Sequence, residues 1–139
     1  MKIIFSMLKV EHIGIAVKNL EASKKLFKTL LNASCYKIEN VESEMVSTAF
    51  FKTGGTKIEL LETTNPEGAI GKFIEKRGEG IHHIAYEVAD INAEVKRLKE
   101  AGFIFTRDEP FRGADNKMVI FLHPKSTNGV LIELCQEIK

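Results

Sequence analysis

The chain has 139 residues, of which 44% are apolar and 28% charged, and its formal net charge at pH 7 is +1. This length is that of one domain with a substantial core, and this balance is typical of a soluble globular protein rather than a disordered one. The composition does not indicate nucleic-acid binding, because acidic and basic residues are interspersed instead of clustered on a basic background.

The sequence does not indicate a disulfide framework, a signal peptide or a membrane span. Cys35 and Cys135 are too few for a disulfide framework and show no CxxC spacing, so we expect reduced thiols that fill small core spaces in a cytoplasmic protein. Residues 1–7 start with a base and a short apolar stretch, but a signal peptide needs about 7–15 apolar residues and a cleavage site. No run approaches the roughly 18 apolar residues of a membrane span.

Apolar periodicity predicts a series of strands and helices. In chain order these are strand 12–17, helix 20–31, strands 36–38, 46–51 and 56–61, helix 70–76, strand 81–88, helix 91–101, and strands 103–106, 117–122 and 130–136. Asn19 is typical of a helix N-cap, and Gly102 of the residue after a helix. Gly54 and Gly55 indicate a tight turn between two strands.

The predicted elements form the same β-α-β-β-β series twice. We therefore expect two modules, about 8–62 and 81–136, joined by a linker at 63–80. One module alone leaves a face of its sheet uncovered, and two modules side by side cover it within a single domain, 1–139. The predicted fold class is α+β, with one eight-stranded curved mixed sheet, helices outside and a metal-binding cleft inside.

Four side chains recur at matched places in the two halves. His12 matches His83, and Glu59 matches Glu133. Because alternate residues of a strand share a face, all four are expected opposite the apolar residues that meet the helices. Two imidazoles and two carboxylates suit a divalent ion such as Zn, Co, Ni or Mn, and open coordination positions would make the site catalytic.

The alternative for each residue alone is a solvated position on the wet face of a strand. Only the matched placement of all four residues in the two halves favours a metal site, because isolated carboxylates in apolar strands need partners. His82 lies outside the repeat alignment and His123 has no repeat partner, so both are expected to be structural or surface residues.

The motifs around these residues resemble the vicinal oxygen chelate superfamily, which includes glyoxalase I, and most of all its methylmalonyl-CoA epimerase family. The resemblance spans about residues 8–136. Its motifs are 12–17, 56–62, 78–85 and 123–134, of which the last two are the most specific.

The resemblance implies an enzyme of propionate metabolism that interconverts the 2R and 2S forms of methylmalonyl-CoA with a divalent metal ion (Co, Zn, Mn or Ni). The metal ligands it implies are His12, Glu59, His83 and Glu133. Glu133 would also transfer the α-proton, while the metal ion stabilises the enolate. A homodimer is common in this superfamily.

One departure from the family concerns the second acid/base group that inversion requires. A described epimerase carries a Glu on the strand before the glycine turn, where this chain has Ser47, give or take one residue. Serine is a poor base at neutral pH, so a metal-bound water, Glu42 or Glu44 are the alternatives, and the assignment stays open.

The CoA part of an acyl-CoA thioester is expected near basic or turn residues at the cleft mouth. The candidate substrate-binding residues are Ser47, Arg112, Lys125, Ser126 and Thr127. Their alternative role is that of solvated loop residues.

Two other functions compete with the epimerase. Glyoxalase I (lactoylglutathione lyase) shares the ligand set in its metal-dependent bacterial forms and also removes a proton next to a carbonyl, but the flanking motifs favour the epimerase. The other is a metal-poor small-molecule-binding protein of the same fold, against which the full ligand set argues.

Overall fold

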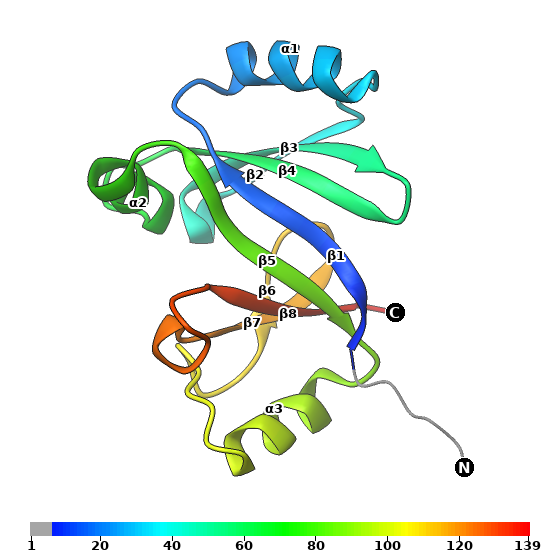
Figure 1. The fold of residues 1–139 in the computed structure, drawn as a ribbon, viewed down its shortest axis with the longest axis vertical. Coiled ribbons are helices and arrows are strands. Elements are labelled where there is room, and N and C mark those ends of the chain that lie inside the picture. Colours follow the sequence, from blue (N-terminus) through cyan, green and yellow to red (C-terminus); the bar gives the residue numbers. More distant parts are fainter. Residues whose placement is uncertain (1–6) are drawn as a thin grey trace. The chain divides into compact units, whose positions relative to one another are not determined.

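The structure is a computed structural model that describes residues 7–139 of the chain. Its strands and helices are β1 (Met7–Ala16), α1 (Leu20–Leu31), β2 (Lys37–Val41), β3 (Val46–Thr53), β4 (Thr56–Thr63), α2 (Ala69–Arg77), β5 (Gly80–Val88), α3 (Ile91–Glu100), β6 (Phe111–Arg112), β7 (Lys117–Leu122) and β8 (Ile132–Glu137) (Figure 1). Two short 3₁₀ turns are η1 (Glu42–Glu44) and η2 (Pro124–Ser126). The apolar stretch weighed above as a signal peptide lies, up to residue 6, outside the described residues.

The hydrogen-bonded order of the strands is β2-β3-β4-β1-β5-β8-β7-β6. The pairs β1–β4 and β5–β8 are parallel, whereas β2–β3, β3–β4, β6–β7 and β7–β8 are antiparallel. The prediction of an α+β fold with eight strands in one mixed sheet is confirmed. Among residues 7–139, no helix is long and apolar enough to cross a membrane.

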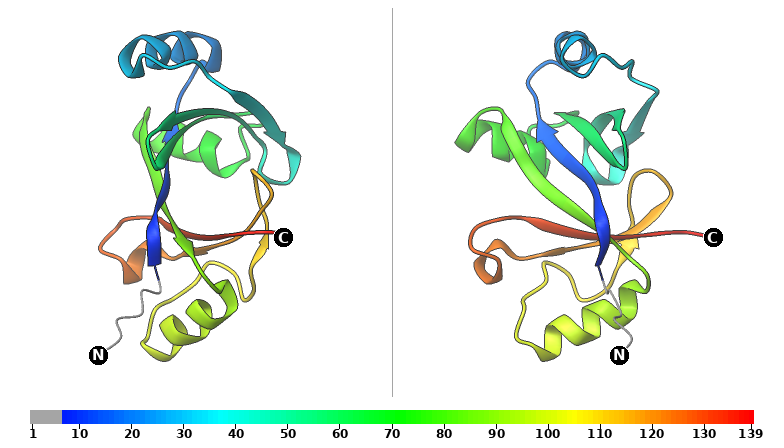
Figure 2. Two further views of the ribbon diagram at one scale, coloured as in Figure 1. Left: turned by 90° about the vertical axis from the view of Figure 1, so that its right-hand side faces the viewer. Right: turned by 45° about the vertical axis from the view of Figure 1, so that its right-hand side comes forward.

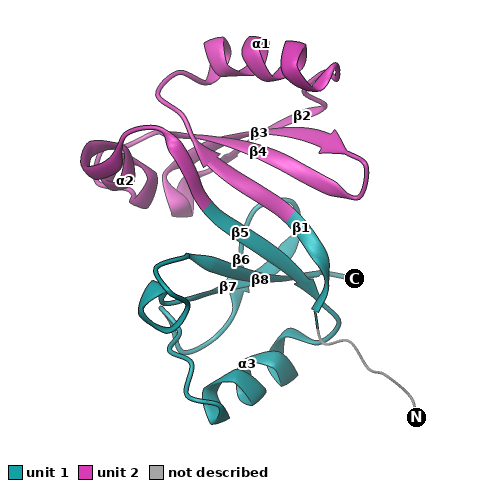
Figure 3. Ribbon diagram, viewed as in Figure 1, with its two compact units in different colours: residues 1–11, 83–139 teal, residues 12–82 magenta. Residues whose placement is uncertain are grey.

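The chain divides into two compact units, coloured separately in Figure 3. Unit 2 is His12–His82, with the second half of β1, then α1, β2, β3, β4 and α2. Unit 1 is His83–Lys139 together with the N-terminal segment that ends at Glu11, and it contains most of β5, then α3, β6, β7 and β8. The interpretation of 1–139 as one domain stays a prediction.

In unit 2, the helices α1 and α2 lie on opposite faces of the strands β2, β3 and β4 (Figure 2). The first turn of α1 is capped by Asn19, whose Oδ1 accepts a hydrogen bond from the Ala22 N–H at 2.9 Å. The buried side chains beneath α1 are Val17, Leu20, Ala49, Phe51 and Leu60. We call the opposite face the inner face of unit 2; α2 covers one end of it with Ile70 packed on Ala16, Val46 and Leu61.

Unit 1 repeats this arrangement around α3. The N-cap is Asp90, whose Oδ1 accepts from the Ala93 N–H at 3.1 Å. One face of β7 and β8 packs against α3 in a core of Val88, Ile91, Val95, Leu98, Ile120, Leu122 and Leu134. We call the face turned away from α3 the inner face of unit 1.

One predicted strand is wrong. Residues 103–106 form only an isolated bridge, between Phe105 and Leu122, and the strand that precedes β7 and pairs with it is β6 at Phe111–Arg112. The Phe103 N–H donates to the Leu98 carbonyl at the end of α3, and Phe103 and Phe105 pack against the α3 core. Their apolar alternation therefore reflects packing beside a helix end rather than a strand.

Candidate metal and catalytic site

Unit 2 contains a buried pair formed by His12 on β1 and Glu59 on β4. The imidazole Nδ1 lies 3.1 Å from the carboxylate Oε2, and each side chain is 5% exposed. In the parallel register Gly14 stands opposite Glu59. Because Gly14 has no side chain, the carboxylate has room to lean along the strand toward His12.

Unit 1 contains the matching pair, His83 on β5 and Glu133 on β8. Here Nε2 lies 3.3 Å from Oε1, and each side chain is 7% exposed. The residue opposite Glu133 in the parallel register is Ala85, which is fully buried. The two halves thus share the same strand register. In each half a small residue stands opposite the Glu, and the His precedes that small residue by two positions.

The neighbours of each pair confirm the strand faces expected from alternation. Ile58 and Leu60, which flank Glu59, belong to the core under α1. Ile132 and Leu134, which flank Glu133, belong to the core with α3. Both His–Glu pairs therefore lie on the inner faces of their units, away from α1 and α3.

The chemistry of the donors fits a divalent metal ion. Each unit offers an imidazole nitrogen and a carboxylate oxygen that are buried and directed at one another. An ionised carboxylate at such a depth costs several kcal/mol unless a partner compensates its charge. Nitrogen and oxygen donors of this kind suit Zn, Co, Ni or Mn.

A further buried carboxylate was not found from the sequence. Glu11, next to His12 on β1, is only 2% exposed. The alternation of β1 assigns residue 11 to the apolar face shared by Ile13 and Ile15, and so it gave no reason to expect a carboxylate there. The only sequence signal is that Glu11 lies next to the candidate ligand His12.

The predicted substrate-binding residue Ser47 lies on the face of β3 that bears α1. It stands opposite Glu62, next to the buried Ala49 and Phe51 in alternation. Thr48 occupies the inner face instead and is 1% exposed. The position of the family's second acid/base Glu was placed at Ser47 to within one residue, and the residue of that range on the side of Glu59 is Thr48.

The other candidate substrate residues are held within their own loops. The Ser126 hydroxyl donates to the His123 carbonyl at 3.0 Å, and the Thr127 hydroxyl donates to the Val130 carbonyl. Arg112 donates to the Asn116 side-chain oxygen. Among the residues proposed for CoA, Lys125 and Arg112 present exposed cationic side chains.

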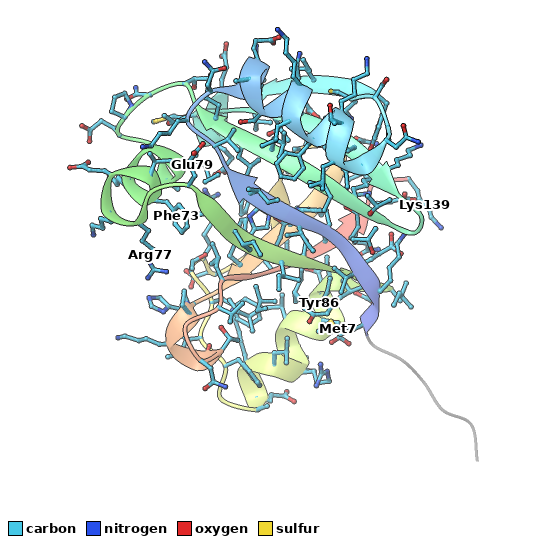
Figure 4. The ribbon with its side chains drawn as sticks, turned by 45° about the horizontal axis from the view of Figure 1, so that its top comes forward. Met7, Phe73, Arg77, Glu79, Tyr86 and Lys139 are labelled. Carbon is cyan, nitrogen blue, oxygen red and sulfur yellow. The ribbon has the colours of Figure 1, made fainter. Side chains whose placement is uncertain are left out.

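The two remaining histidines have structural contacts. The His82 ring meets Phe73 of α2 edge-on, with centroids 5.0 Å apart. Arg77 lies over the same Phe73 ring, and both Phe73 and Arg77 are labelled in Figure 4. His123 accepts a hydrogen bond at Nδ1 from the Lys125 N–H at 3.1 Å, which shapes the turn η2.

Residues 11–121 match the model of the glyoxalase/bleomycin resistance protein/dioxygenase superfamily. This match covers most of the chain. The chain belongs to this superfamily.

Relatives within the superfamily include epimerases of CoA thioesters. An ethylmalonyl-CoA/methylmalonyl-CoA epimerase of Cereibacter sphaeroides is 42% identical over 92% of this chain and 97% of its own. Streptomyces coelicolor methylmalonyl-CoA epimerase, solved as a variant with 2-nitronate-propionyl-CoA, is 35% identical, with a TM-score of 0.91 over 95% of this chain and 96% of its own. A methylmalonyl-CoA epimerase in complex with methylmalonyl-CoA and NH₄⁺ gives the same identity, TM-score and coverage.

In this member of the superfamily an aromatic wall lies beside the unit 1 pair, and sequence reasoning missed it. The His83 ring meets Phe121 edge-on at 5.7 Å, and Phe121 stands opposite Glu133 in the β7–β8 register. Phe111 follows at 6.4 Å from Phe121, and the Arg107 guanidinium lies 3.7 Å above the Phe111 ring. These rings give the inner face of unit 1 an apolar surface next to its candidate ligands.

The same inner face holds Cys135, which is fully buried. Burial raises the pKa of its thiol, and the nearby carboxylates of Glu133, Glu11 and Glu87 raise it further, while Lys117 opposes them. Since a thiolate is the nucleophilic form, this superfamily member keeps Cys135 protonated and inert at neutral pH.

We therefore expect a thiol reagent such as dithionitrobenzoate to modify Cys135 only after unfolding, because the native thiol is both buried and protonated. In the Cys35→Ser variant, which leaves Cys135 alone, the native protein at pH 8 should release almost no chromophore until denaturant is added. The Cys135→Ser variant, which keeps the half-buried Cys35, is the control. Rapid reaction of Cys135 in the native protein would contradict the assignment.

Proposed function

We propose that the chain is a methylmalonyl-CoA epimerase, which interconverts the 2R and 2S forms of its thioester substrate. The observation that carries the proposal is the duplicated, buried His–Glu pair, one in each unit. The relatives that match more than nine-tenths of the chain and bear this name support it.

The four residues His12, Glu59, His83 and Glu133 are proposed to hold one divalent metal ion between them. Support comes from their equivalent registers, their burial and their mixed nitrogen and oxygen donors. When bound, the metal would act as a Lewis acid that withdraws electron density from the thioester oxygen and so stabilises the enolate charge. The donor set does not distinguish Co, Zn, Mn and Ni from one another.

The Glu133 carboxylate is proposed as one of the two proton-transfer groups. It accepts the proton on C2, the C–H bond breaks, and its electron pair delocalises into the thioester carbonyl. The surrounding aromatic and aliphatic side chains, among them Phe121 and the fully buried Ala85, exclude water from this carboxylate. A proton delivered to the opposite face of the planar intermediate then completes the inversion.

Neither alternative from the sequence is favoured. Lactoylglutathione lyase would use the same four side chains, but the relatives reported above are epimerases of acyl-CoA thioesters. A binding protein without metal would have no need of two buried His–carboxylate pairs, whose burial is costly in the absence of a cation.

The substrate is proposed to place its CoA phosphates near exposed cationic residues of unit 1. Lys125 in η2 and Arg112 on β6 supply the charges, while Ser126 and Thr127 shape the loop that carries Lys125. Thr48, rather than Ser47, is the β3 hydroxyl on the inner face with Glu59.

We also propose a cytoplasmic homodimer that acts in propionate metabolism. The likeness to a bacterial epimerase, over 97% of that relative's length, supports the location and the metabolism, and the dimer is proposed because homodimers are common in this superfamily. Light scattering should give a mass of twice the 15.6 kDa of one chain. A mass of 15.6 kDa at micromolar concentration would contradict the dimer but not the activity.

The activity is tested by supplying metal-loaded protein with single epimers of methylmalonyl-CoA in deuterated water. We expect deuterium at C2 and loss of optical purity, and the Glu133→Gln variant should lower the inversion rate about 100-fold or more because a proton-transfer group is lost. NMR at C2 measures both quantities. Lyase turnover of methylglyoxal and glutathione without any exchange at C2 would overturn the proposal.

The ligand assignment is tested by metal content. Wild type should retain about one divalent ion per chain, while the His12→Ala, His83→Ala double variant should retain almost none, because half of the donor atoms are gone. Mass spectrometry after dialysis against trace metal gives the stoichiometry. His82→Ala is the matched control, since His82 packs on Phe73, and it should keep its metal. Full metal occupancy in the double variant would refute the assignment.

A further inference from the structure

The inner face of unit 1 places an aromatic ring directly beside the His83–Glu133 pair, where the substituent at C2 of a substrate would lie. We propose that Phe121 on β7 sets the size of this substituent, so that the site takes malonyl-type CoA thioesters with a short 2-alkyl group and discriminates against longer ones. This assignment rests on the proposed function, since it concerns the substrate range of the same site.

Phe121 lies against one member of the pair and stands across from the other. Its ring meets the His83 ring edge-on, with centroids 5.7 Å apart. In the antiparallel β7–β8 register it is directly opposite Glu133, and the Cβ atoms of such residues are about 4.5–5.5 Å apart on one face of a sheet. A C2 proton that is transferred to Glu133 must lie within about 3 Å of its carboxylate. A carbon atom bonded to C2 is then within reach of the Phe121 ring.

Phe121 also keeps accessible surface at this place. Four other side chains on this part of the inner face are buried, namely His83, Glu133, Val119 and Cys135, whereas Phe121 is half-buried. An alkyl group that approaches the Glu133 carboxylate gains by removing the apolar surface of the ring from water. An anionic group at the same place would meet both the negative π-surface of the ring and the charge of Glu133. The ring therefore favours the alkyl substituent on its side of C2.

The Phe121 ring is held from two sides, so it acts as a wall rather than as a movable side chain. His83 supports one side, and on the other Phe111 lies with its centroid 6.4 Å away. Phe111 itself packs against a buried cluster that includes Ala85, and the Arg107 guanidinium covers its ring at 3.7 Å. Moving Phe121 aside would disturb this whole arrangement.

The backbone after Phe111 keeps the second ring close to β7. A Cβ on Gly113 would lie 2.8 Å from Cγ2 of Val119, so only a glycine permits this approach. The Gly113 N–H donates to the Lys117 carbonyl at 2.9 Å, next to the β6–β7 pairing (Figure 1). Displacing Phe111 to admit a longer alkyl chain would therefore disturb the pairing of two strands.

The expected selectivity follows from the length of the alkyl group. One methylene too many for an apolar pocket lowers kcat/KM by about 10–200-fold. We expect kcat/KM of the wild type to fall at least about 10-fold from the 2-methyl to the 2-propyl thioester.

The test compares 2-methylmalonyl-CoA and 2-propylmalonyl-CoA on the same preparation of metal-loaded protein, with inversion at C2 followed by NMR in deuterated water. Phe121→Val, which removes the ring and keeps the position apolar, should raise the ratio of kcat/KM for propyl over methyl about 10-fold. Phe121→Trp, which enlarges the wall, should lower the same ratio. Because each ratio compares two substrates on one preparation, any inactive fraction of a variant cancels.

The matched control is Phe105→Val, which removes another half-buried ring of unit 1, one that packs against the α3 core. It should leave the ratio at its wild-type value. A contact can also be measured apart from turnover, in protein whose phenylalanine rings alone are protonated. The 2-alkyl protons of the bound thioester should then show nuclear Overhauser effects to ring signals that are absent in Phe121→Val.

Four outcomes overturn the assignment of Phe121 while the epimerase itself stands. They are equal inversion of both thioesters by the wild type, an unchanged ratio in both Phe121 variants, an equal change of ratio in Phe105→Val, and Overhauser effects confined to other rings. Wild-type protein that inverts neither thioester would refute the proposed function, and this assignment with it.

Discussion

The burial of carboxylates beside imidazoles is the constraint on which the rest of this structure depends. Removing one ionised carboxylate from water costs several kcal/mol, while a whole domain is stable by only about 5–15 kcal/mol. Glu59 and Glu133 are nonetheless almost completely buried. Each must therefore have a partner within hydrogen-bonding distance, and the parallel pairs β1–β4 and β5–β8 supply it with a His at 3.1–3.3 Å.

The register of these parallel pairs explains other residue choices. A Glu can lean toward a His two positions away only if the residue opposite it is small, and both Gly14 and Ala85 meet this condition. A shift of one residue in either strand would move the carboxylate to the face packed under a helix. The apolar cores under α1 and α3 thus fix the register, and the register assembles each pair.

Outside the two pairs the inner faces differ. The inner face of unit 1 continues from His83 into the rings of Phe121 and Phe111, while that of unit 2 continues from Glu59 through Phe50 to the charged pair of Lys37 and Glu39. The repeat therefore accounts for what both halves share, which is a buried His–Glu pair. The surroundings of the pair are what distinguishes one half from the other.

The sequence predicts an element correctly where the signals for it lie within that element. The helix 20–31 agrees with α1 because its cap and periodicity lie within it, and strand 117–122 agrees with β7 for the same reason. Strand 103–106 was wrong because the apolar alternation of those residues serves packing against α3.

The neighbours of the candidate ligands that the sequence did not predict are of another kind. Phe121 belongs to an apolar strand, and only the register of β7 with β8 shows that it stands opposite Glu133. Thr48 rather than Ser47 lies on the inner face for the same reason, because a shift of one residue changes the face of a strand on which a side chain lies. Matched motifs therefore identify the residues that the two halves share, whereas the residues that stand beside them on other strands are found only from strand pairing.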